Sequence, residues 1–425
     1  MNQIHNLKEL SFLVYGLGAS GRSVVKFFKK IKIKNYKVWD DSEKKKLKYP
    51  NLENLNKTLK KVDFIVLSPG ITLLNNKRLK KYKKKIITDI DLFYLTKNKS
   101  KTIVVTGTNG KSTTCKLLAH LLSYKKFKFS IGGNIGTPIL DLKHSKSQYV
   151  IIEASSFQLS HSKFICPDYA FFLNLTNDHL DWHGSKKDYL NSKLKIFSLQ
   201  SKDNYALINK KFKKKFIEKN FLSKLLISKI EEYEKIKHKI NNRYLNLNIN
   251  NENMSFVLKF SKLLGISDKS FIKAMKTFKG LPHRFEIFLK KNNITFINDS
   301  KATSFKAAQV ALSSIKNVYW ILGGLPKKSD KIEISDLKKN IIKCYLIGKN
   351  ITYFKKQIEG KINFTVTKNL ENSIISILKD IKSKNNLKKN ILLSPAAASF
   401  DQFDNFESRG DEFKKICFKY ARRFI

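Results

Sequence analysis

The feature that most constrains the fold is a glycine-rich loop between an apolar run and an amphipathic segment. At 103–114 the sequence IVVTGTNGKSTT passes from β-branched residues into a loop that carries Lys111 and Ser112. Leucines at helical spacing follow, so we predict a helix over 115–125. A strand, a glycine loop and a helix in this order direct backbone N–H groups and the positive end of the helix dipole toward a phosphate group.

This loop predicts a binding site for the phosphates of ATP. Lys111 would neutralise phosphate charge, and the Ser112 hydroxyl would reach a Mg²⁺ ion. The usual spacing places a first glycine at position 105, where this chain has Val105. A tight strand-to-helix turn with a solvated lysine is the alternative interpretation. The residues expected around the phosphates are Gly107, Thr108, Asn109, Gly110, Lys111, Ser112 and Thr113.

A second glycine loop lies near the start of the chain. The sequence FLVYGLGASGRSVVKFF at 12–28 places Gly16, Gly18 and Gly21 as G-x-G-x-x-G between a predicted strand and a predicted helix, and Asp40 ends the next strand. Alone, this dinucleotide fingerprint would suggest an NAD dehydrogenase. A hydride-transfer enzyme has no use for a triphosphate loop, so we expect the first fold to hold a different diphosphate. A glycine turn that serves only helix–strand packing is the alternative.

Apolar runs alternate with helical stretches along the chain, which predicts an α/β protein of three domains. We expect a Rossmann-like domain at 1–96, a central P-loop ATPase-type α/β domain at 97–280 and a C-terminal doubly wound α/β domain at 281–425. A Lys/Asn-rich stretch near 210–253 is too low in complexity to interpret. Strands are predicted at 12–15, 37–39, 63–67 and 85–87, and in the later segments ITFIND, VYWILGG, KCYLIG and NILLSPA.

The charge of the chain raises the question of its partners. The 425 residues carry a formal net charge of +50, but only seven of the 84 basic residues are arginine, and the lysines are spread through every segment. We therefore expect small anionic substrates and no nucleic-acid partner. The chain has four scattered cysteines, no signal-like start and no apolar run near the roughly 20 residues of a membrane span. These features predict a soluble cytoplasmic protein without membrane insertion.

Polar residues after predicted strands are candidates for metal and substrate binding. Glu153 ends the apolar run of VIIEASSFQL, where a carboxylate could hold Mg²⁺ opposite Ser112. His179 lies between two aspartates in NLTNDHLDWHGS, where it could equally hydrogen-bond its own loop. Lys193 lies in the helical YLNSKLKIF and is unremarkable on spacing alone.

Three polar segments of the third domain also follow strands, namely NDSKATS, GGLPKKSD and SPAAASFDQFDNFESRGDEF. Asp299 could accept a hydrogen bond from a ribose. Lys301, Lys327 and Ser399 could bind a carboxylated substrate, although Ser399 could equally be a turn residue. Lys328 beside Lys327 leaves the choice of pocket lysine open.

Taken together, TGTNGKST, GGNIG, EASSFQL, NLTNDHLDWHG, YLNSKLKIF, GLPHRFE, NDSKATS and SPAAASFDQFDNFESRGDEF resemble the motifs of the Mur ligases of peptidoglycan synthesis, in family order from about 11 to 418. The chain is most similar to the branch that adds D-glutamate to UDP-N-acetylmuramoyl-L-alanine. The resemblance implies a UDP-substrate in the first domain, ATP between the second and third, and an acyl-phosphate intermediate. We expect a monomer. Sister ligases that add diaminopimelate carry a D-N-P-R motif that is not found here.

The resemblance also implies roles for single residues. Lys111, His179 and Lys193 would be catalytic. Two Mg²⁺ ions are implied, one held by Ser112 and Glu153, the other by His179 and an N6-carboxylated Lys193. Further positions around ATP are Asn253, Arg284 and Asp299. The UDP-substrate side comprises Ala19, Ser20, Gly21, Asp40, Ser68, Pro69, Gly70, Asn134, Ser155 and Gln158. The D-glutamate pocket comprises Lys301, Thr303, Lys327, Ser399 and Phe406.

The sequence departs from the family pattern at several positions. Ile249 stands where the family usually has a histidine, and Trp182 stands where arginine is common. Asp41 and Ser42 differ from the Thr-Arg pair of some relatives, which puts the uridine contacts in doubt. None of these changes removes a predicted catalytic group.

Overall fold

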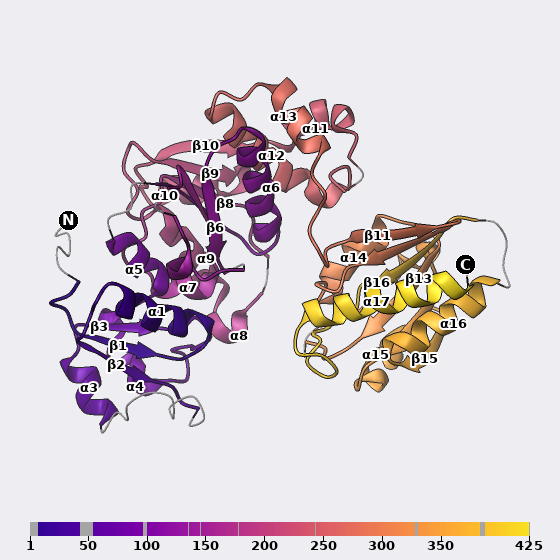
Figure 1. The fold of residues 1–425 in the computed structure, drawn as a ribbon, viewed down its shortest axis with the longest axis horizontal. Helices are drawn as coiled ribbons and strands as arrows, with labels where there is room; N and C mark the ends of the chain where they lie inside the picture. The colour runs from indigo at the N-terminus through magenta and orange to yellow at the C-terminus, as the bar shows by residue number, and fades with distance from the viewer. Residues whose placement is uncertain are drawn as a thin grey trace. The chain divides into compact units, whose positions relative to one another are not determined.

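The computed structural model describes residues 7–42, 54–96, 100–134, 136–144, 146–176, 178–242, 244–327, 330–382 and 387–424. Lys328 lies outside these ranges, as do residues 97–99 at the predicted boundary between the first two domains. The described strands form three sheets (Figure 1). By contacts the chain divides into two compact units, Met1–Asn242 with Asn250–Phe278, and Arg243–Ile249 with Lys279–Ile425. None of the described helices combines the length and the apolar character that a bilayer crossing needs.

The first sheet is parallel throughout and has the order β2-β1-β3-β4. Its strands are the apolar runs that the sequence predicted, because a parallel sheet covered on both faces needs continuous apolar strands. The strands are β1 (Phe12–Tyr15), β2 (Tyr36–Trp39), β3 (Phe64–Leu67) and β4 (Ile86–Ile87). The helices are α1 (Ala19–Lys30), α3 (Leu55–Lys61), α4 (Lys77–Lys80) and α5 (Asp89–Leu95).

The second sheet is also parallel, with the order β10-β9-β8-β5-β7-β6. Its strands are β5 (Lys101–Thr106), β6 (Phe129–Gly133), β7 (Tyr149–Glu153), β8 (Tyr169–Phe172), β9 (Tyr205–Asn209) and β10 (Lys224–Ser228). Its helices are α6 (Lys111–Tyr124), α7 (Ser156–His161), α8 (Leu180–His183), α9 (Lys186–Leu194), α10 (Lys213–Glu218), α11 (Ile230–Ile240), α12 (Asn251–Leu263) and α13 (Asp268–Lys276). The Lys/Asn-rich stretch therefore holds a strand and several helices, and the predicted helix at 115–125 begins four residues earlier, at Lys111.

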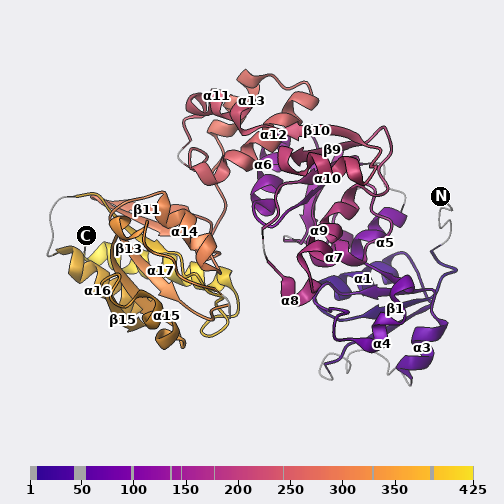
Figure 2. The ribbon, with the colours of Figure 1, turned by 180° about the vertical axis from the view of Figure 1, so that it is seen from behind.

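The third sheet, in the C-terminal unit, has the order β11-β12-β16-β13-β14-β15, and only its edge strand β11 is antiparallel. Its strands are β11 (Glu286–Lys291), β12 (Ile294–Asn298), β13 (Val318–Gly323), β14 (Ile341–Ile347), β15 (Phe364–Lys368) and β16 (Lys389–Leu393). Its helices are α14 (Phe305–Ser313), α15 (Ile351–Ile358), α16 (Leu370–Lys382) and α17 (Phe406–Phe424). Helices α14 and α15 pack on one face, and α16 and α17 on the other (Figure 2), which confirms the doubly wound prediction.

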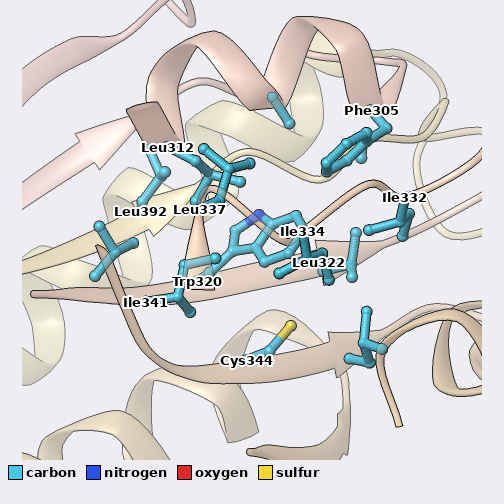
Figure 3. Close-up of a cluster of buried hydrophobic side chains, with 14 of the residues drawn as sticks. Phe305, Leu312, Trp320, Leu322, Ile332, Ile334, Leu337, Ile341, Cys344 and Leu392 are labelled. Atoms are coloured by element: carbon cyan, nitrogen blue, oxygen red, sulfur yellow. The ribbon is translucent and has the colours of Figure 1, made fainter. Parts of the chain in front are cut away.

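One face of the third sheet packs around Trp320 of β13. The indole ring is fully buried among aliphatic side chains that include Leu312, Leu337 and Leu392 (Figure 3). Its Nε1–H donates a hydrogen bond of 2.7 Å to the carbonyl of Ser394. The ring therefore fills the core while its one polar atom is satisfied, and it fixes the segment that follows β16.

We expect Trp320→Ala to lower the free energy of unfolding by about 3–5 kcal/mol, because it leaves a cavity in a packed core and removes a buried hydrogen bond. Urea unfolding followed by circular dichroism measures the change. Tyr124→Ala is the control, since this aromatic side chain is 41% exposed and its loss should change stability by about 0.5 kcal/mol or less. Equal effects of the two substitutions would contradict the assignment of Trp320 to the core.

Candidate functional site

The loop after β5 has the conformation that its glycines allow. Gly110 is the N-cap of α6 and adopts φ 81°, in the left-handed region that favours glycine. A Cβ atom placed on Gly110 would lie 2.1 Å from Oδ1 of Asn253. The same oxygen accepts a hydrogen bond of 3.3 Å from the Thr114 hydroxyl. Asn253 of α12, which was predicted to bind ATP, therefore packs directly against the phosphate loop at Gly110.

Two lysines meet on one carbonyl oxygen of this loop. The Lys111 ammonium donates to the carbonyls of Gly107 and Thr108, at 3.0 and 2.9 Å. The Lys193 ammonium, from α9, donates to the same Gly107 carbonyl at 2.7 Å and is only 1% exposed. Burial, and then the charge of Lys111, lower the pKa of Lys193 well below its usual value. The structure thus joins two predicted catalytic residues to the predicted loop.

The aromatic ring of Tyr189 holds this arrangement together. Its hydroxyl lies 3.0 Å from Oγ1 of Thr108, and the Lys193 ammonium lies 4.6 Å from its ring centroid. The ring of His179 contacts the Tyr189 ring in a T-shaped arrangement, with 6.2 Å between the ring centroids. Tyr189 was not among the predicted site residues, because a lone tyrosine in a lysine-rich helix carries no spacing signal.

Glu153 ends β7, next to β5 in the sheet. Its Oε1 accepts a hydrogen bond of 3.0 Å from Nδ2 of Asn134. Its Oε2 is buried and has no hydrogen-bond partner among the described residues. A buried, unpaired carboxylate oxygen fits a divalent cation, which prefers oxygen ligands. Ser112, its predicted partner, is buried in the first turn of α6.

His179 precedes the short helix α8 and adopts φ 55°. Its backbone N–H donates to Oδ1 of Asp178 at 3.0 Å, and its Nε2 lies 3.5 Å from Oδ2 of the same aspartate. Within the described ranges, no group of three or more His, Cys, Asp or Glu side chains is placed to hold a metal ion. The pairing of His179 with Lys193 as metal ligands stays a prediction.

The first glycine loop is held by two of the predicted substrate residues. A Cβ atom on Gly21 would lie 1.8 Å from the carbonyl oxygen of Gly16, so the G-x-G-x-x-G spacing allows α1 to approach the loop. Asp40 accepts a hydrogen bond of 2.6 Å from the Leu17 N–H, and the Ser68 hydroxyl donates to the Gly16 carbonyl at 2.7 Å. Ala19 and Ser20 open α1, and Pro69 and Gly70 follow β3 in a turn. Their role in binding UDP stays a prediction.

The other predicted substrate residues lie where the second sheet meets the first. Ser155 caps α7: its hydroxyl accepts a hydrogen bond from the Gln158 N–H, and the side-chain amide oxygen of Gln158 accepts one from the Ser155 N–H. The Gln158 amide donates to both carboxylate oxygens of Asp89, at 3.2 and 3.3 Å. Asp89 begins α5 and is buried, which raises its pKa. Sequence reasoning missed Asp89, because its partner lies 69 residues away in the chain.

In the C-terminal unit, Asp299 follows β12 and is buried. Its Oδ1 accepts from the Phe285 N–H at 3.1 Å, and its Oδ2 accepts from the Ser394 hydroxyl at 2.7 Å. Burial raises the pKa of Asp299 to about 7, and the nearby charge of Arg284 opposes that rise. The two residues predicted around ATP in this unit therefore interact with one another.

The predicted amino-acid pocket draws on loops after three strands of the same sheet. The Lys301 ammonium lies 4.6 Å from the ring centroid of Phe406, and the Thr303 N–H donates to the Lys301 carbonyl. The Ser399 carbonyl accepts from two backbone N–H groups, as the turn alternative predicted. Lys327 follows β13, and its carbonyl accepts from a backbone N–H three residues on. The structure therefore joins Lys301 to Phe406 and leaves the pocket as a whole a prediction.

Arg409 of α17 is a buried cation that the sequence analysis did not single out. Its guanidinium donates to the hydroxyl and the carbonyl of Ser300 and to the carbonyl of Ala397. Burial lowers its pKa to about 10. It joins the loops after β12 and β16, which carry several predicted pocket residues. Only its place in the ESRGDEF motif could have marked it.

Asn174 was also missed, although it opens the NLTNDHLDWHG motif. Its Oδ1 accepts hydrogen bonds from the N–H groups of Thr108 and Asn109, at 3.1 and 2.9 Å. The phosphate loop is thus held by a side chain that follows β8. Spacing along the chain could not show this contact, because the two segments are 65 residues apart.

Known proteins are similar to this chain in sequence and in fold. Residues 105–265 match the family model of the Mur ligase middle domain. A UDP-N-acetylmuramoylalanine–D-glutamate ligase of Rickettsia felis is 35% identical, and the match covers 96% of this chain and 97% of the relative. The enzyme of the same name from Wolbachia sp. subsp. Brugia malayi is 34% identical, with 99% of each chain covered.

Solved structures of two ligases from Thermotoga maritima have the same fold. The MurF ligase in complex with ADP has a TM-score of 0.57 at 17% identity, covering 98% of each chain. The UDP-N-acetylmuramate–alanine ligase MurC has a TM-score of 0.56 at 16% identity, covering 97% of this chain and 99% of the other. With relatives of more than 30% identity over nearly the full length, the chain belongs to the Mur ligase family, in its branch of UDP-N-acetylmuramoylalanine–D-glutamate ligases.

Proposed function

We propose that this chain is an ATP-dependent ligase that joins D-glutamate to UDP-N-acetylmuramoyl-L-alanine in peptidoglycan synthesis. The observation that carries the proposal is the phosphate loop, where Lys111 and Lys193 meet on the Gly107 carbonyl. On the neighbouring strand Glu153 offers a carboxylate oxygen that has no hydrogen-bond partner among the described residues. These groups suit a triphosphate with a divalent cation rather than a nicotinamide dinucleotide.

The reaction first activates a carboxylate and then forms an amide. The γ-phosphoryl group of ATP passes to the carboxylate of the L-alanyl group, ADP leaves, and an acyl phosphate forms. The amine of D-glutamate attacks the acyl carbon, the bond to the phosphate oxygen breaks, and the amine nitrogen gives up its proton. Several anions meet in these steps, so we expect Lys111 to leave its loop carbonyls and neutralise the phosphoryl group in transfer.

The divalent cations are proposed to be two Mg²⁺ ions. When bound, they would neutralise phosphate charge and hold the phosphoryl donor and acceptor in line. Ser112 and Glu153 would hold one ion, which the unpaired Oε2 of Glu153 supports. His179 and a carboxylated Lys193 would hold the other.

The environment of Lys193 supports its carboxylation. A neutral amine adds to the carbon of CO₂ and loses one proton, which leaves an N-linked carboxylate. Burial and the nearby Lys111 lower the pKa of Lys193, so a larger share of its amine is neutral at neutral pH. The product would replace a buried cation with an oxygen ligand for Mg²⁺.

The remaining predicted residues are proposed to bind the substrates. The first glycine loop with Asp40 would take the UDP group, and the buried network of Ser155 and Gln158 would face the acceptor. In the C-terminal unit Arg284 and Asp299 would contribute to ATP binding. Lys301, Thr303, Lys327, Ser399 and Phe406 would bind D-glutamate. We further propose a cytoplasmic monomer that acts on these small molecules and needs neither nucleic acid nor membrane insertion.

A panel of amino acids in an ATP-consumption assay tests this function. With UDP-N-acetylmuramoyl-L-alanine present, phosphate release should require an amino acid and be fastest with D-glutamate. The proposal would be rejected if phosphate were released equally fast or faster with L-alanine in place of D-glutamate. It would also be rejected if phosphate release did not depend on the acceptor.

Gly110→Ala should weaken ATP binding about tenfold or more, because the new Cβ atom meets Asn253 and the left-handed backbone is strained. Isothermal titration with Mg-ATP measures the affinity. Gly265→Ala is the matched control, since Gly265 has φ 70° but no atom within 4 Å of an added Cβ. The Gly265→Ala variant should have a lower free energy of unfolding and an unchanged affinity for ATP. An unchanged affinity in Gly110→Ala would show that the loop is not the ATP site.

Lys193→Ala should lose activity by about a hundredfold or more, and short carboxylic acids added to the assay should restore part of it. The added acid would supply the oxygen ligand that the carboxylated side chain provides. Lys111→Ala should lose activity similarly and gain nothing from the acids, because it lacks a cation and not a ligand. A fully active Lys193→Ala variant, or equal rescue of both variants, would refute the ligand role.

A further inference from the structure

A chain of polar side chains runs from the phosphate loop to helix α12. It begins at Asn174, whose side chain is buried and makes three hydrogen bonds with the loop. The Oδ1 atom accepts from the N–H groups of Thr108 and Asn109, and the Nδ2 atom donates to the Asn109 carbonyl at 3.2 Å. The side-chain amide offers an acceptor and a donor on separate atoms, so Asn174 bonds both N–H and C=O groups of the loop backbone.

The amide of Asn174 is oriented by Glu252, the second residue of α12. The Oε2 atom of Glu252 accepts from Nδ2 of Asn174 at 2.6 Å. Its Oε1 atom accepts from Nδ2 of Asn209 at the end of β9, at 3.1 Å. A carboxylate only accepts hydrogen bonds. If the Asn174 amide were flipped, its oxygen would face this carboxylate and its NH₂ group would face two loop N–H groups.

We propose that Glu252 is a positioning residue for the phosphate loop and acts through Asn174. It fixes the orientation of the Asn174 amide, and that orientation sets the loop at Thr108 and Asn109. The next residue of the helix, Asn253, contacts the loop at Gly110. Two consecutive residues of α12 therefore bear on the loop, Glu252 through Asn174 and Asn253 at Gly110. The inference rests on the proposed function only in taking this loop as the ATP site.

A swap of the two functional groups tests the pair. Asn174→Asp places two carboxylates against each other where a 2.6 Å hydrogen bond now lies. We expect it to raise the KM for ATP and the Kd of Mg-ATP about ten- to a hundredfold, the cost of a lost bond to a charged group. Glu252→Gln restores a donor opposite the new carboxylate, so the double variant should recover a large part of the lost affinity. It should not recover all of it, because a carboxylate at position 174 cannot donate to the Asn109 carbonyl.

A second Glu–Asn pair, between α11 and α12, is the matched control. Oε1 of Glu234, on α11, accepts from Nδ2 of Asn251 at 3.3 Å. The swap Asn251→Asp with Glu234→Gln changes the same groups without touching the loop. It should leave the KM for ATP unchanged. Melting temperatures of all variants separate a loss of fold from a loss of loop positioning.

Two outcomes would overturn the inference. One is that the effects of Asn174→Asp and Glu252→Gln on ATP affinity simply add in the double variant. The other is that melting temperatures fall while the KM for ATP stays constant. If Asn174→Asp does not fold, Glu252→Ala takes its place in the test. This variant should bind ATP about tenfold or more weakly than the wild type. Unchanged ATP binding in Glu252→Ala would also reject the inference. A wild-type protein that binds no Mg-ATP would instead refute the proposed function.

Discussion

The carbonyl oxygen of Gly107 is the acceptor on which the predicted catalytic lysines depend. Lys111 and Lys193 both donate to it, at 3.0 and 2.7 Å, although their like charges repel each other. Burial and the charge of Lys111 lower the pKa of Lys193, so the pair can share one acceptor when one amine is neutral. The same contact joins α9 to a loop 86 residues earlier in the chain. The lowered pKa of Lys193 thus reduces the charge repulsion at this shared acceptor.

Both glycine loops of the first unit are held by polar side chains from neighbouring elements. Asp40 and Ser68, which follow β2 and β3, hydrogen-bond the backbone of the first loop. Asn174, which follows β8, hydrogen-bonds the backbone of the second loop, and Asn253 of α12 packs against that loop at Gly110. In parallel sheets the carboxyl ends of the strands gather at one edge, so residues far apart in the chain can converge on a single loop. The loops can then use glycine for their turns without being flexible.

The sequence analysis predicted what depends on local pattern. The strand at 12–15 matches β1 in full, and the glycine loop at 107–110 lies between β5 and α6 as expected. The edge strand β11 was missed, because its residues are only partly buried and carry no continuous apolar run. Among the site residues, Glu153 was predicted from its place after a strand. Glu252 was not, because it lies in a lysine- and asparagine-rich stretch where composition hides the pattern.

The sequence by itself determined the α/β class, the two glycine loops and the family, since apolar periodicity, glycine spacing and motif order are properties of the chain. Tertiary structure alone decided which side chains share an acceptor and which carboxylate oxygen has no partner among the described residues. Lys193 looks like any other lysine of this basic chain until the fold buries it against Gly107. Its special chemistry comes from desolvation and from a nearby charge, and both arise only when distant segments pack together.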